Sequence, residues 1–178
     1  MRKLISLVAA GALALTFAST ALAASPVVSP AKSSGSIVGI AVANGNFKTL
    51  VAAVGCANPA VAAALTSGDQ LTVFAPTDAA FAKLGLTAGN ICGALPQGAL
   101  TQILLCHVET GRHFSNSVLP KFAGQTKNID TLLGQSFQVS STGTITTTSG
   151  GHAAIVLANI PATNGVIHVV DSVLIPSL

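Results

Sequence analysis

The stretch that decides the fold is LTVFAPTDAAFAKL, which runs from Leu71 to Leu84. Its first four residues are apolar or β-branched, and turn-forming residues follow them, which predicts a short strand. Pro76-Thr77-Asp78 then predicts a turn, and Asp78 is placed to cap the helix that follows. In that helix we expect Phe81 and Leu84 to point into the core. This stretch is therefore a buried strand leading directly into a helix.

The segments on either side of this stretch are helical in pattern. Apolar residues recur at helical spacing from Ser36 to Val54. Asn44-Gly45 divides that segment into two helices, and Asn46 is placed to cap the second. Pro59 to Leu65 predicts a third helix, because proline is favoured in the first turn. After the stretch, a further helix is predicted from about Gln97 to Leu105.

The second half of the chain predicts strands instead. Its short runs of β-branched residues are separated by Gly, Ser, Asn and Thr, and they are Phe137–Val139, Thr144–Thr146, His152–Ala158 and Val166–Val170. Asn164-Gly165 predicts the tight turn that leads into the last strand. Helices first and strands later predict an α+β domain, with the helices on one side or end of a largely antiparallel sheet.

The first residues have the features of an export signal. Arg2 and Lys3 precede an uncharged apolar run from Leu4 to Ala18, and small residues at Ala21 and Ala23 form the A-x-A cleavage pattern. We therefore expect residues 1–23 to be a signal peptide and 24–35 to be a flexible Ser/Pro/Ala-rich lead-in. The mature chain, with no membrane span, is then expected to be secreted or periplasmic.

Composition narrows the class of function. Half of the residues are hydrophobic and only 7% are charged, which is incompatible with a mainly disordered chain. The chain has eight Lys and Arg against five Asp and Glu, and Arg2 and Lys3 belong to the leader. Because the other cations are scattered singly, we expect no nucleic-acid partner. The low charge leaves room for an apolar binding surface.

The three cysteines are Cys56, Cys92 and Cys106. Export to an oxidising compartment favours a disulfide, and three cysteines allow three pairs with one thiol left over. We expect Cys56 to pair with Cys92, because Cys56 follows a helical run and Cys92 lies in a Gly/Asn-rich loop, and both places have some surface access. Cys106 lies in the apolar run from Ile103 to Val108, where a free thiol behaves as a small hydrophobe.

Two histidines and an aspartate are the polar residues to examine for chemistry. His168 lies between apolar neighbours in a predicted strand, and His107 lies at a helix-to-strand junction. Each is expected to be hydrogen-bonded in the core, while Asp78 is expected to act as a cap. If the three converged, they could bind a metal, but their spacing matches no metal-binding motif. We therefore expect no metal and no cofactor.

The sequence contains no catalytic motif. No G-x-S-x-G elbow is present, and neither Gly150-Gly151-His152 nor Thr163-Asn164-Gly165 has the context of a phosphate-binding loop. Cys106 and His107 are adjacent, so on an extended segment their side chains would point to opposite faces and could not form a dyad. The absence of these motifs disfavours a secreted hydrolase, and we expect the chain not to be an enzyme.

Three segments together resemble the fasciclin domain family. The run LTVFAPTDAAFAKL is similar to the first signature block of that family, and TNGVIHVVDSVLIP, from Thr163 to Pro176, is similar to the second. Between them, Ile103 to Val108 resembles a segment in which the family has a Tyr-His pair. Cys106 stands where the tyrosine is usual, so an adhesive role that depends on that pair is in doubt. The resemblance covers a single domain, residues 36–177.

The resemblance implies both a fold and a role. The fold is a wedge-shaped sandwich or barrel-like core of about seven strands, capped by several helices. The role is adhesion in the cell envelope or outside the cell, with a protein or polysaccharide partner. The alternative is a carrier of an apolar small molecule, such as a carotenoid, held in a groove between the sheet and a helical lid. The candidate interaction residues are Thr77, Asp78, Cys106, His107, Asn164 and His168.

Overall fold

The computed structural model describes residues 35–177. The expected signal peptide, residues 1–23, and the lead-in as far as residue 34 lie outside the described residues. The helices are α1 (Ile37–Ala43), α2 (Lys48–Cys56), α3 (Pro59–Thr66), α4 (Asp78–Ala82), α5 (Ile91–Ala94), α6 (Gln97–Cys106) and α7 (Ser115–Val118). The strands are β1 (Leu71–Pro76), β2 (Val108–Thr110), β3 (Thr126–Asp130), β4 (Ser136–Ser140), β5 (Thr144–Thr147), β6 (His152–Ala162) and β7 (Gly165–Val170).

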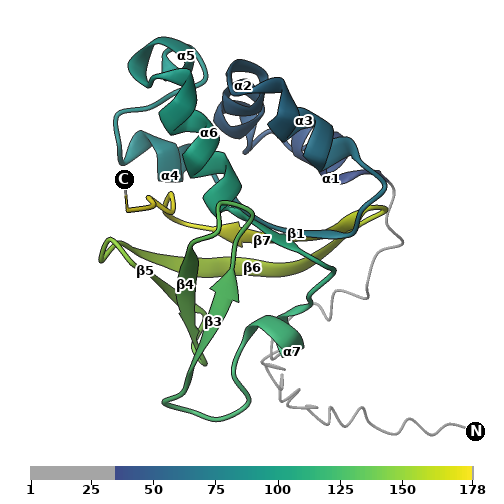
Figure 1. Ribbon diagram of the computed structural model, residues 1–178, viewed down its shortest axis with the longest axis vertical. Coiled ribbons are helices and arrows are strands. Elements are labelled where there is room, and N and C mark those ends of the chain that lie inside the picture. Colours follow the sequence, from purple (N-terminus) through teal and green to yellow (C-terminus); the bar gives the residue numbers. More distant parts are fainter. Residues whose placement is uncertain (1–34, 178) are drawn as a thin grey trace, which may run out of the picture.

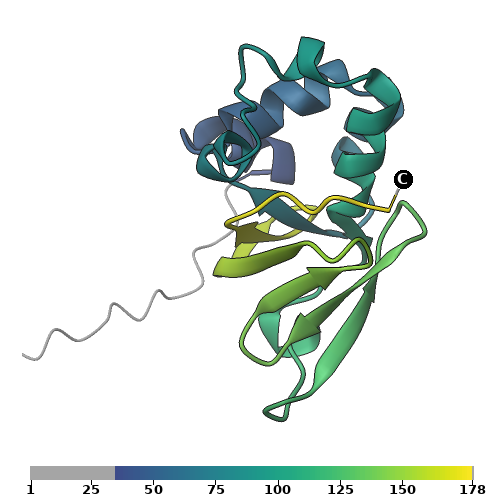
Figure 2. The same ribbon diagram turned by 90° about the vertical axis from the view of Figure 1, so that its left-hand side faces the viewer.

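The seven strands form one sheet in the order β2-β1-β7-β6-β5-β4-β3. Every neighbouring pair is antiparallel except β1 and β7, which run parallel in register from Leu71 opposite Gly165 to Pro76 opposite Val170. Helices α1 to α6 lie on one side of β1 and β7, and the β3–β5 half of the sheet lies on the other side (Figures 1 and 2). The expectations of an α+β fold and about seven strands are confirmed.

β1 and β7 are central because both of their faces are covered. All six residues of each strand are buried, as is typical of parallel strands with a layer on either side. Because side chains alternate along a strand, Val73 and Ile167 belong to the core beneath the helices, whereas Phe74 and Val170 belong to the core on the other face. The two strands therefore separate two hydrophobic cores.

The second core fills the space between the two halves of the sheet. Phe74 of β1 meets Phe137 of β4 edge to face, with ring centroids 5.0 Å apart. Ile129 of β3 and Ile145 of β5 are buried in the same cluster. Such aromatic pairs add about 0.5–1.5 kcal/mol beyond the area they bury.

Gly165, the first residue after the turn between β6 and β7, must be a glycine because β1 approaches it closely. Ala162 pairs with Gly165, so Thr163 and Asn164 form the tight turn. A β-carbon on Gly165 would overlap the carbonyl oxygen of Leu71, where β1 begins beside β7. This close approach of two backbones excludes every other residue type at position 165 unless the strands shift.

A disulfide joins Cys56, the last residue of α2, to Cys92 in α5. Their Cα atoms are 5.5 Å apart, within the normal range for a disulfide. Cys106 is free and buried. The predicted pairing and the predicted free thiol are both confirmed.

Two details of the helices differ from the predictions. Leu84 was expected in the core but is 45% exposed, because α4 ends at Ala82 and Leu84 lies in the turn that follows. Asn46 does not cap α2: the cap position is Phe47, and no side chain of its own segment caps this helix. The acceptor comes instead from Asp78, as described below.

The strand predictions were incomplete. β2 and β3 were not predicted, and β6 extends to Ala162 rather than ending at Ala158. β3 contains one buried residue, Ile129, among exposed polar neighbours, so its sequence has no strong alternation. It pairs along β4, whose buried residues are Phe137 and Val139.

Candidate functional site

Thr77 and Asp78 begin α4 but serve two different helices. The Thr77 hydroxyl accepts a hydrogen bond from the backbone N–H of Ala80 at 3.2 Å and so caps α4. The Asp78 carboxylate accepts the N–H of Thr49 at 2.7 Å and that of Lys48 at 3.4 Å. Asp78 is thus a cap, as expected, but for the first turn of α2 rather than for its own helix.

His107 joins the end of α6 to the C-terminal segment. Its Nδ1 lies 2.7 Å from the carbonyl oxygen of Ile103, to which it donates, and its Nε2 accepts the N–H of Leu174 at 2.9 Å. One nitrogen donates and the other accepts, so the imidazole is neutral. Burial lowers the pKa of His107 to about 4, although the hydrogen bond to Ile103 acts in the opposite direction.

Cys106 has no base to activate it. Burial raises the pKa of its thiol to about 11, so it remains protonated at neutral pH. It ends α6, so the segment is helical rather than extended, and its side chain packs in the second core with Phe74. Both ring nitrogens of His107 are already hydrogen-bonded to the backbone. The two residues therefore form no nucleophile–base pair.

His168 lies in the middle of β7 and is completely buried. Its Nε2 donates to the carbonyl oxygen of His113 at 2.9 Å, and its Nδ1 accepts the N–H of Asn159 at 3.3 Å. Burial lowers the pKa of His168, which favours the neutral ring that these two bonds require. The expectation that this histidine is hydrogen-bonded in the core is confirmed.

Asn164, in the turn before β7, connects three segments. Its side-chain amide donates to the carbonyl oxygen of Leu65 at 2.8 Å, and its side-chain oxygen accepts the N–H of Ile37 at 2.9 Å. Its backbone carbonyl also accepts the N–H of Leu71 at 3.0 Å. This buried residue therefore fixes the start of α1, the end of α3 and the start of β1.

Of the six candidate interaction residues, four lie in the interior. These are Cys106, His107, Asn164 and His168, so their assignment to an interaction surface is corrected. The Cys106 thiol packs in the second core, and the polar groups of the other three are hydrogen-bonded within the fold. Thr77 and Asp78 are half-exposed. Between residues 35 and 177, no three His, Cys, Asp or Glu side chains come together in a way that could hold a metal ion.

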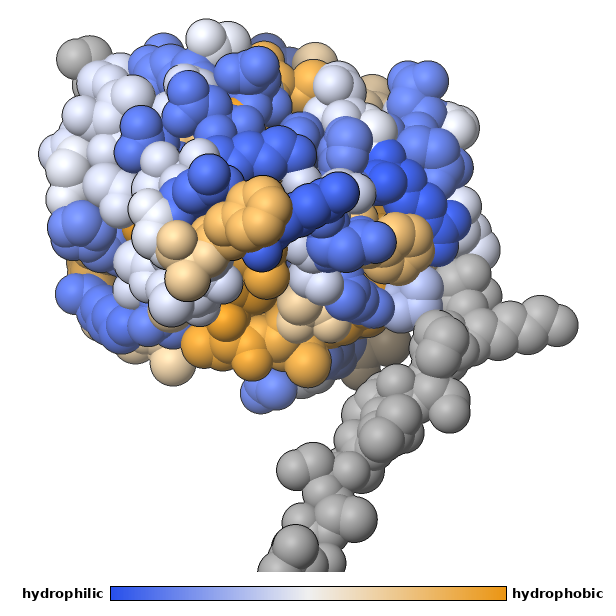
Figure 3. All heavy atoms as spheres, turned by 90° about the horizontal axis from the view of Figure 1, so that it is seen from below, coloured by the Kyte–Doolittle hydropathy of each residue, from blue (hydrophilic) through white to orange (hydrophobic). Residues whose placement is uncertain are grey.

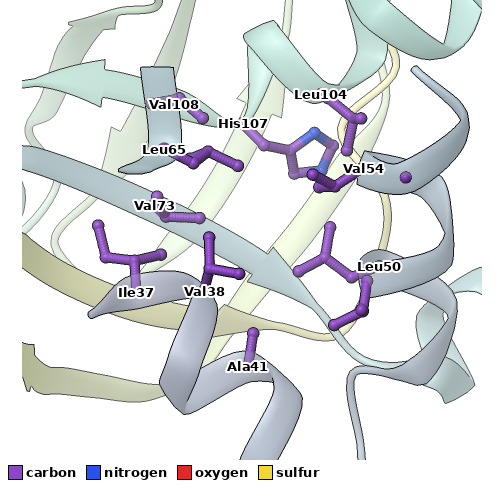
Figure 4. Close-up of a pocket in the computed structure, with 12 residues that line it drawn as sticks. Ile37, Val38, Ala41, Leu50, Val54, Leu65, Val73, Leu104, His107 and Val108 are labelled. Carbon is purple, nitrogen blue, oxygen red and sulfur yellow. The ribbon is translucent and has the colours of Figure 1, made fainter. Parts of the chain in front are cut away.

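The space beneath the helices contains an apolar cavity of about 200 Å³. Aliphatic side chains of α1, α2, α3, α6, β1 and β2 line it, and the His107 ring stands at one end (Figure 4). Its buried floor includes Val73 and Leu104, while Val38, Val51 and Val54 are only half-buried. The cavity therefore reaches towards solvent between α1 and α2.

A second feature is a set of large exposed apolar residues that lie outside the lining of the cavity. Large exposed apolar residues include Phe114 and Phe122, which flank α7, and Val156 and Leu157 of β6. Asn159 of β6 holds α7 against the sheet by hydrogen bonds to Ser115. On the side of the molecule opposite the helical layer, apolar atoms gather amid hydrophilic ones (Figure 3). We call Phe114, Phe122, Val156 and Leu157 the apolar face.

The family model described as "Fasciclin domain" matches residues 45–176, which is most of the chain. The chain belongs to the fasciclin domain family. The resemblance of the two signature segments is confirmed.

Curated relatives of this fasciclin domain come from cyanobacteria and mycobacteria. It is 36% identical to "Uncharacterized protein sll1735" of Synechocystis over 78% of this chain and 96% of the relative, and 36% identical to "Protein sll1483" of the same organism over 80% and 74%. It is also 36% identical to "Immunogenic protein MPB70" of Mycobacterium bovis over 75% of this chain and 65% of that protein.

A solved structure supports the fold of this fasciclin domain. Its title reads "Novel Fold Revealed by the Structure of a FAS1 Domain Pair from the Insect Cell Adhesion Molecule Fasciclin I". The TM-score is 0.56 at 21% identity, and the match covers 74% of this chain and 46% of that one. At this identity, the similarity shows a shared fold.

A groove between the sheet and a helical lid was expected as part of the carrier alternative, but neither the residues that line the cavity nor those of the apolar face were predicted from the sequence of this fasciclin domain. A cavity arises where packing leaves space, and a hydrophobic pattern does not distinguish a filled core from one with space left over. The apolar face had one visible signal. Phe122 follows Lys121 in a stretch without helical or alternating periodicity, where a large aromatic residue has no core to enter.

Proposed function

We propose that this protein is an exported, non-enzymatic binding and adhesion module of the cell envelope or the extracellular space, with a protein or polysaccharide partner. Fasciclin domains are associated with cell adhesion and with extracellular proteins. The leader-like residues 1–23 support export. None of the helices between residues 35 and 177 has the length and apolar character needed to cross a bilayer.

The observation that carries this proposal is the apolar face. Phe122 is 68% exposed, and Val156 and Leu157 are more than half exposed. Large exposed aromatic and aliphatic side chains are candidates for a surface that a partner covers. The Arg112 guanidinium lies over the Phe114 ring, 5.5 Å from its centroid, and so places a cation beside this surface.

A binding experiment with matched variants tests this function. The chain is immobilised, and the retention of purified envelope proteins and polysaccharides from the native host is measured for wild type, Phe122→Ser and Val42→Ser. Val42 is a suitable control because it is 62% exposed but lies in α1, outside the apolar face. We expect Phe122→Ser to lose at least half of the retained partner and Val42→Ser to behave as wild type. Equal retention by all three proteins would refute the role of the face.

The polar residues support the non-enzymatic part of the proposal. His107 and His168 each use both ring nitrogens in hydrogen bonds to backbone groups, so neither is available as a general base. The buried Cys106 thiol is held in its protonated form. We therefore expect no hydrolysis of ester or peptide substrates above the rate without protein.

A second candidate function is a carrier of an apolar small molecule, such as a carotenoid. The specific observation in its favour is the aliphatic cavity between the helices and β1. Protein purified from its native host would then be coloured, or would release a lipid-like compound into organic solvent. A colourless protein that also fails to bind added carotenoid would exclude a carotenoid carrier.

A further inference from the structure

The cavity beneath α1 and α2 is small, apolar and reachable, and these three properties together define what it can hold. We propose that it binds one compact, uncharged, hydrocarbon-like molecule of roughly ten non-hydrogen atoms. This inference deepens the carrier candidate by naming its ligand class, and it is independent of the apolar face.

The volume sets the size of the ligand. A dry aliphatic cavity of about 150 Å³ is enough to bind benzene in another protein, whereas pockets for drug-sized ligands are typically about 300–1,000 Å³. At about 200 Å³, this cavity lies between the two. A single ring with a few substituents fits this space whole, whereas a long polyene such as a carotenoid would have only an end ring inside the cavity and the rest of its chain outside.

The lining sets the chemistry of the ligand. Leu50, Leu65, Val73 and Leu104 present only carbon to the space. His107 is the only polar side chain in the lining, and its two nitrogens are already hydrogen-bonded, to Ile103 at 2.7 Å and to Leu174 at 2.9 Å. An ordered water needs two to four polar partners, and these residues offer it none. A charged ligand would likewise lose its hydration without compensation.

The rim of the cavity gives a route for entry. Val38, Val51 and Val54 are half-buried, and Gly55, near the end of α2, is exposed. A β-carbon on Gly55 would meet no atom within 4 Å, so the rim is open where this side chain is missing. A larger residue at position 55 therefore has room to cover the opening without entering the core.

The test uses benzene as the probe and the full chain as the protein. Binding is followed by amide NMR shifts, and the thermal midpoint is measured at a benzene concentration ten times the fitted Kd. Gly55→Leu covers the rim, and Ala41→Leu fills the space from α1. Gly98→Leu is the matched control, because Gly98 is an exposed helical glycine in α6 with nothing within 4 Å and lies outside the lining.

We expect saturable shifts at lining amides such as Val73, with a midpoint increase of roughly 3–6 °C in wild type and in Gly98→Leu. Gly55→Leu and Ala41→Leu are each expected to weaken benzene binding at least tenfold. If either variant fails to fold, the test rests on the wild type, in which saturable shifts at lining amides would support the proposed site. Wild-type shifts that do not saturate, or that lie away from the cavity, would overturn the inference, as would an unchanged Kd in both folded cavity variants.

The outcome separates this inference from the functions proposed above. Saturable benzene binding by a protein that rejects carotenoid would exclude the carotenoid carrier and leave the compact-ligand site in place. Loss of retention in Phe122→Ser, combined with no benzene binding by wild type, would support the adhesion function and remove the cavity site.

Discussion

His107 is the residue at which chemistry and fold are most closely linked. Its neutral ring connects the end of α6 to Leu174, and protonation of Nε2 would replace the acceptor of that bond with a second donor. Because the pKa is about 4 in the folded protein and about 6.5 in an unfolded chain, the unfolded state binds more protons between these values. We therefore expect the free energy of unfolding to fall as the pH is lowered from about 6.5 to 4, by about 3 kcal/mol from this group. Urea titrations across this range measure the loss.

Two histidine variants provide the controls for this pH dependence. His107→Gln has no proton to gain, so its free energy of unfolding is expected to vary less between pH 6.5 and 4 than that of wild type. His152→Gln changes an exposed histidine outside the core and serves as the matched control for the substitution itself. His168, whose pKa is also lowered by burial, supplies a slope of the same sign that remains in both variants. An unchanged slope in His107→Gln would contradict this assignment.

At the scale of single residues, the sequence could predict burial but not partners. Apolar neighbours on both sides of His168 were enough to place it in the core. Its partners, Asn159 and the carbonyl of His113, come from other segments, as does Leu174, one of the two partners of His107. Asn164 was read as a turn residue, and its bonds to Leu65 and Ile37 depend on the tertiary structure.

Among the elements, α2 depends on a residue that lies outside it. Asp78 accepts the first N–H groups of that helix, so Asp78→Ala leaves the N–H of Thr49, a buried residue, without its acceptor. Loss of a helix cap typically costs about 1 kcal/mol, and up to about 2 kcal/mol. We expect Asp78→Ala to lower the free energy of unfolding by that amount, as measured by urea denaturation.

An aspartate without a capping role serves as the control. Asp130→Ala, at an exposed position in β3, is expected to change the free energy of unfolding by less than about 0.5 kcal/mol. If the two variants were equally stable, the Asp78 carboxylate would contribute nothing to α2. Amide exchange at Thr49 reports on the same bond, and it should be faster in Asp78→Ala only.

The elements that could be predicted are those with a strong local pattern. β1, α4 and α6 were found from hydrophobic periodicity and turn residues, because burial of one or both faces dictates their composition. β3 could not be found in this way. Its polar sequence forms a strand because its backbone pairs with the edge of β4. That edge exists only once the sheet has formed, so the sequence of β3 alone does not predict the strand.

On the scale of the whole molecule, the Cys56–Cys92 disulfide holds the helical layer together. It connects α2 to α5 across 36 residues that include β1. Cross-linking a loop of this length is expected to contribute about 4 kcal/mol by restricting the unfolded chain. We expect the Cys56→Ala/Cys92→Ala variant to unfold at a markedly lower urea concentration than wild type.

A third cysteine variant shows whether the effect is specific to the bond. Cys106→Ala removes the buried thiol, keeps the disulfide, and should cost less than the double variant because it deletes a single atom from the core. Peptide mapping of the native protein should find its free thiol at Cys106. Mapping that placed Cys106 in the bridge would overturn the pairing.

The overall architecture was more predictable than the cavity within it. The segments from Leu71 and from Thr163 resembled two family signatures, and the structure shows that their strands are the central parallel pair. The cavity depends on the small volume differences left when α1, α2 and β1 pack together, which no single segment encodes.

The parallel pairing of β1 with β7 also constrains the order in which this protein can be assembled. β1 and β7 separate the two cores, and their pairing brings Leu71–Pro76 beside Gly165–Val170. Neither core is therefore complete until β7 is present. Contacts between such distant residues slow folding because a long loop must close first. A nascent chain that has not yet reached Gly165 therefore has neither core closed, and translation must pass Val170 before this domain can reach its native state.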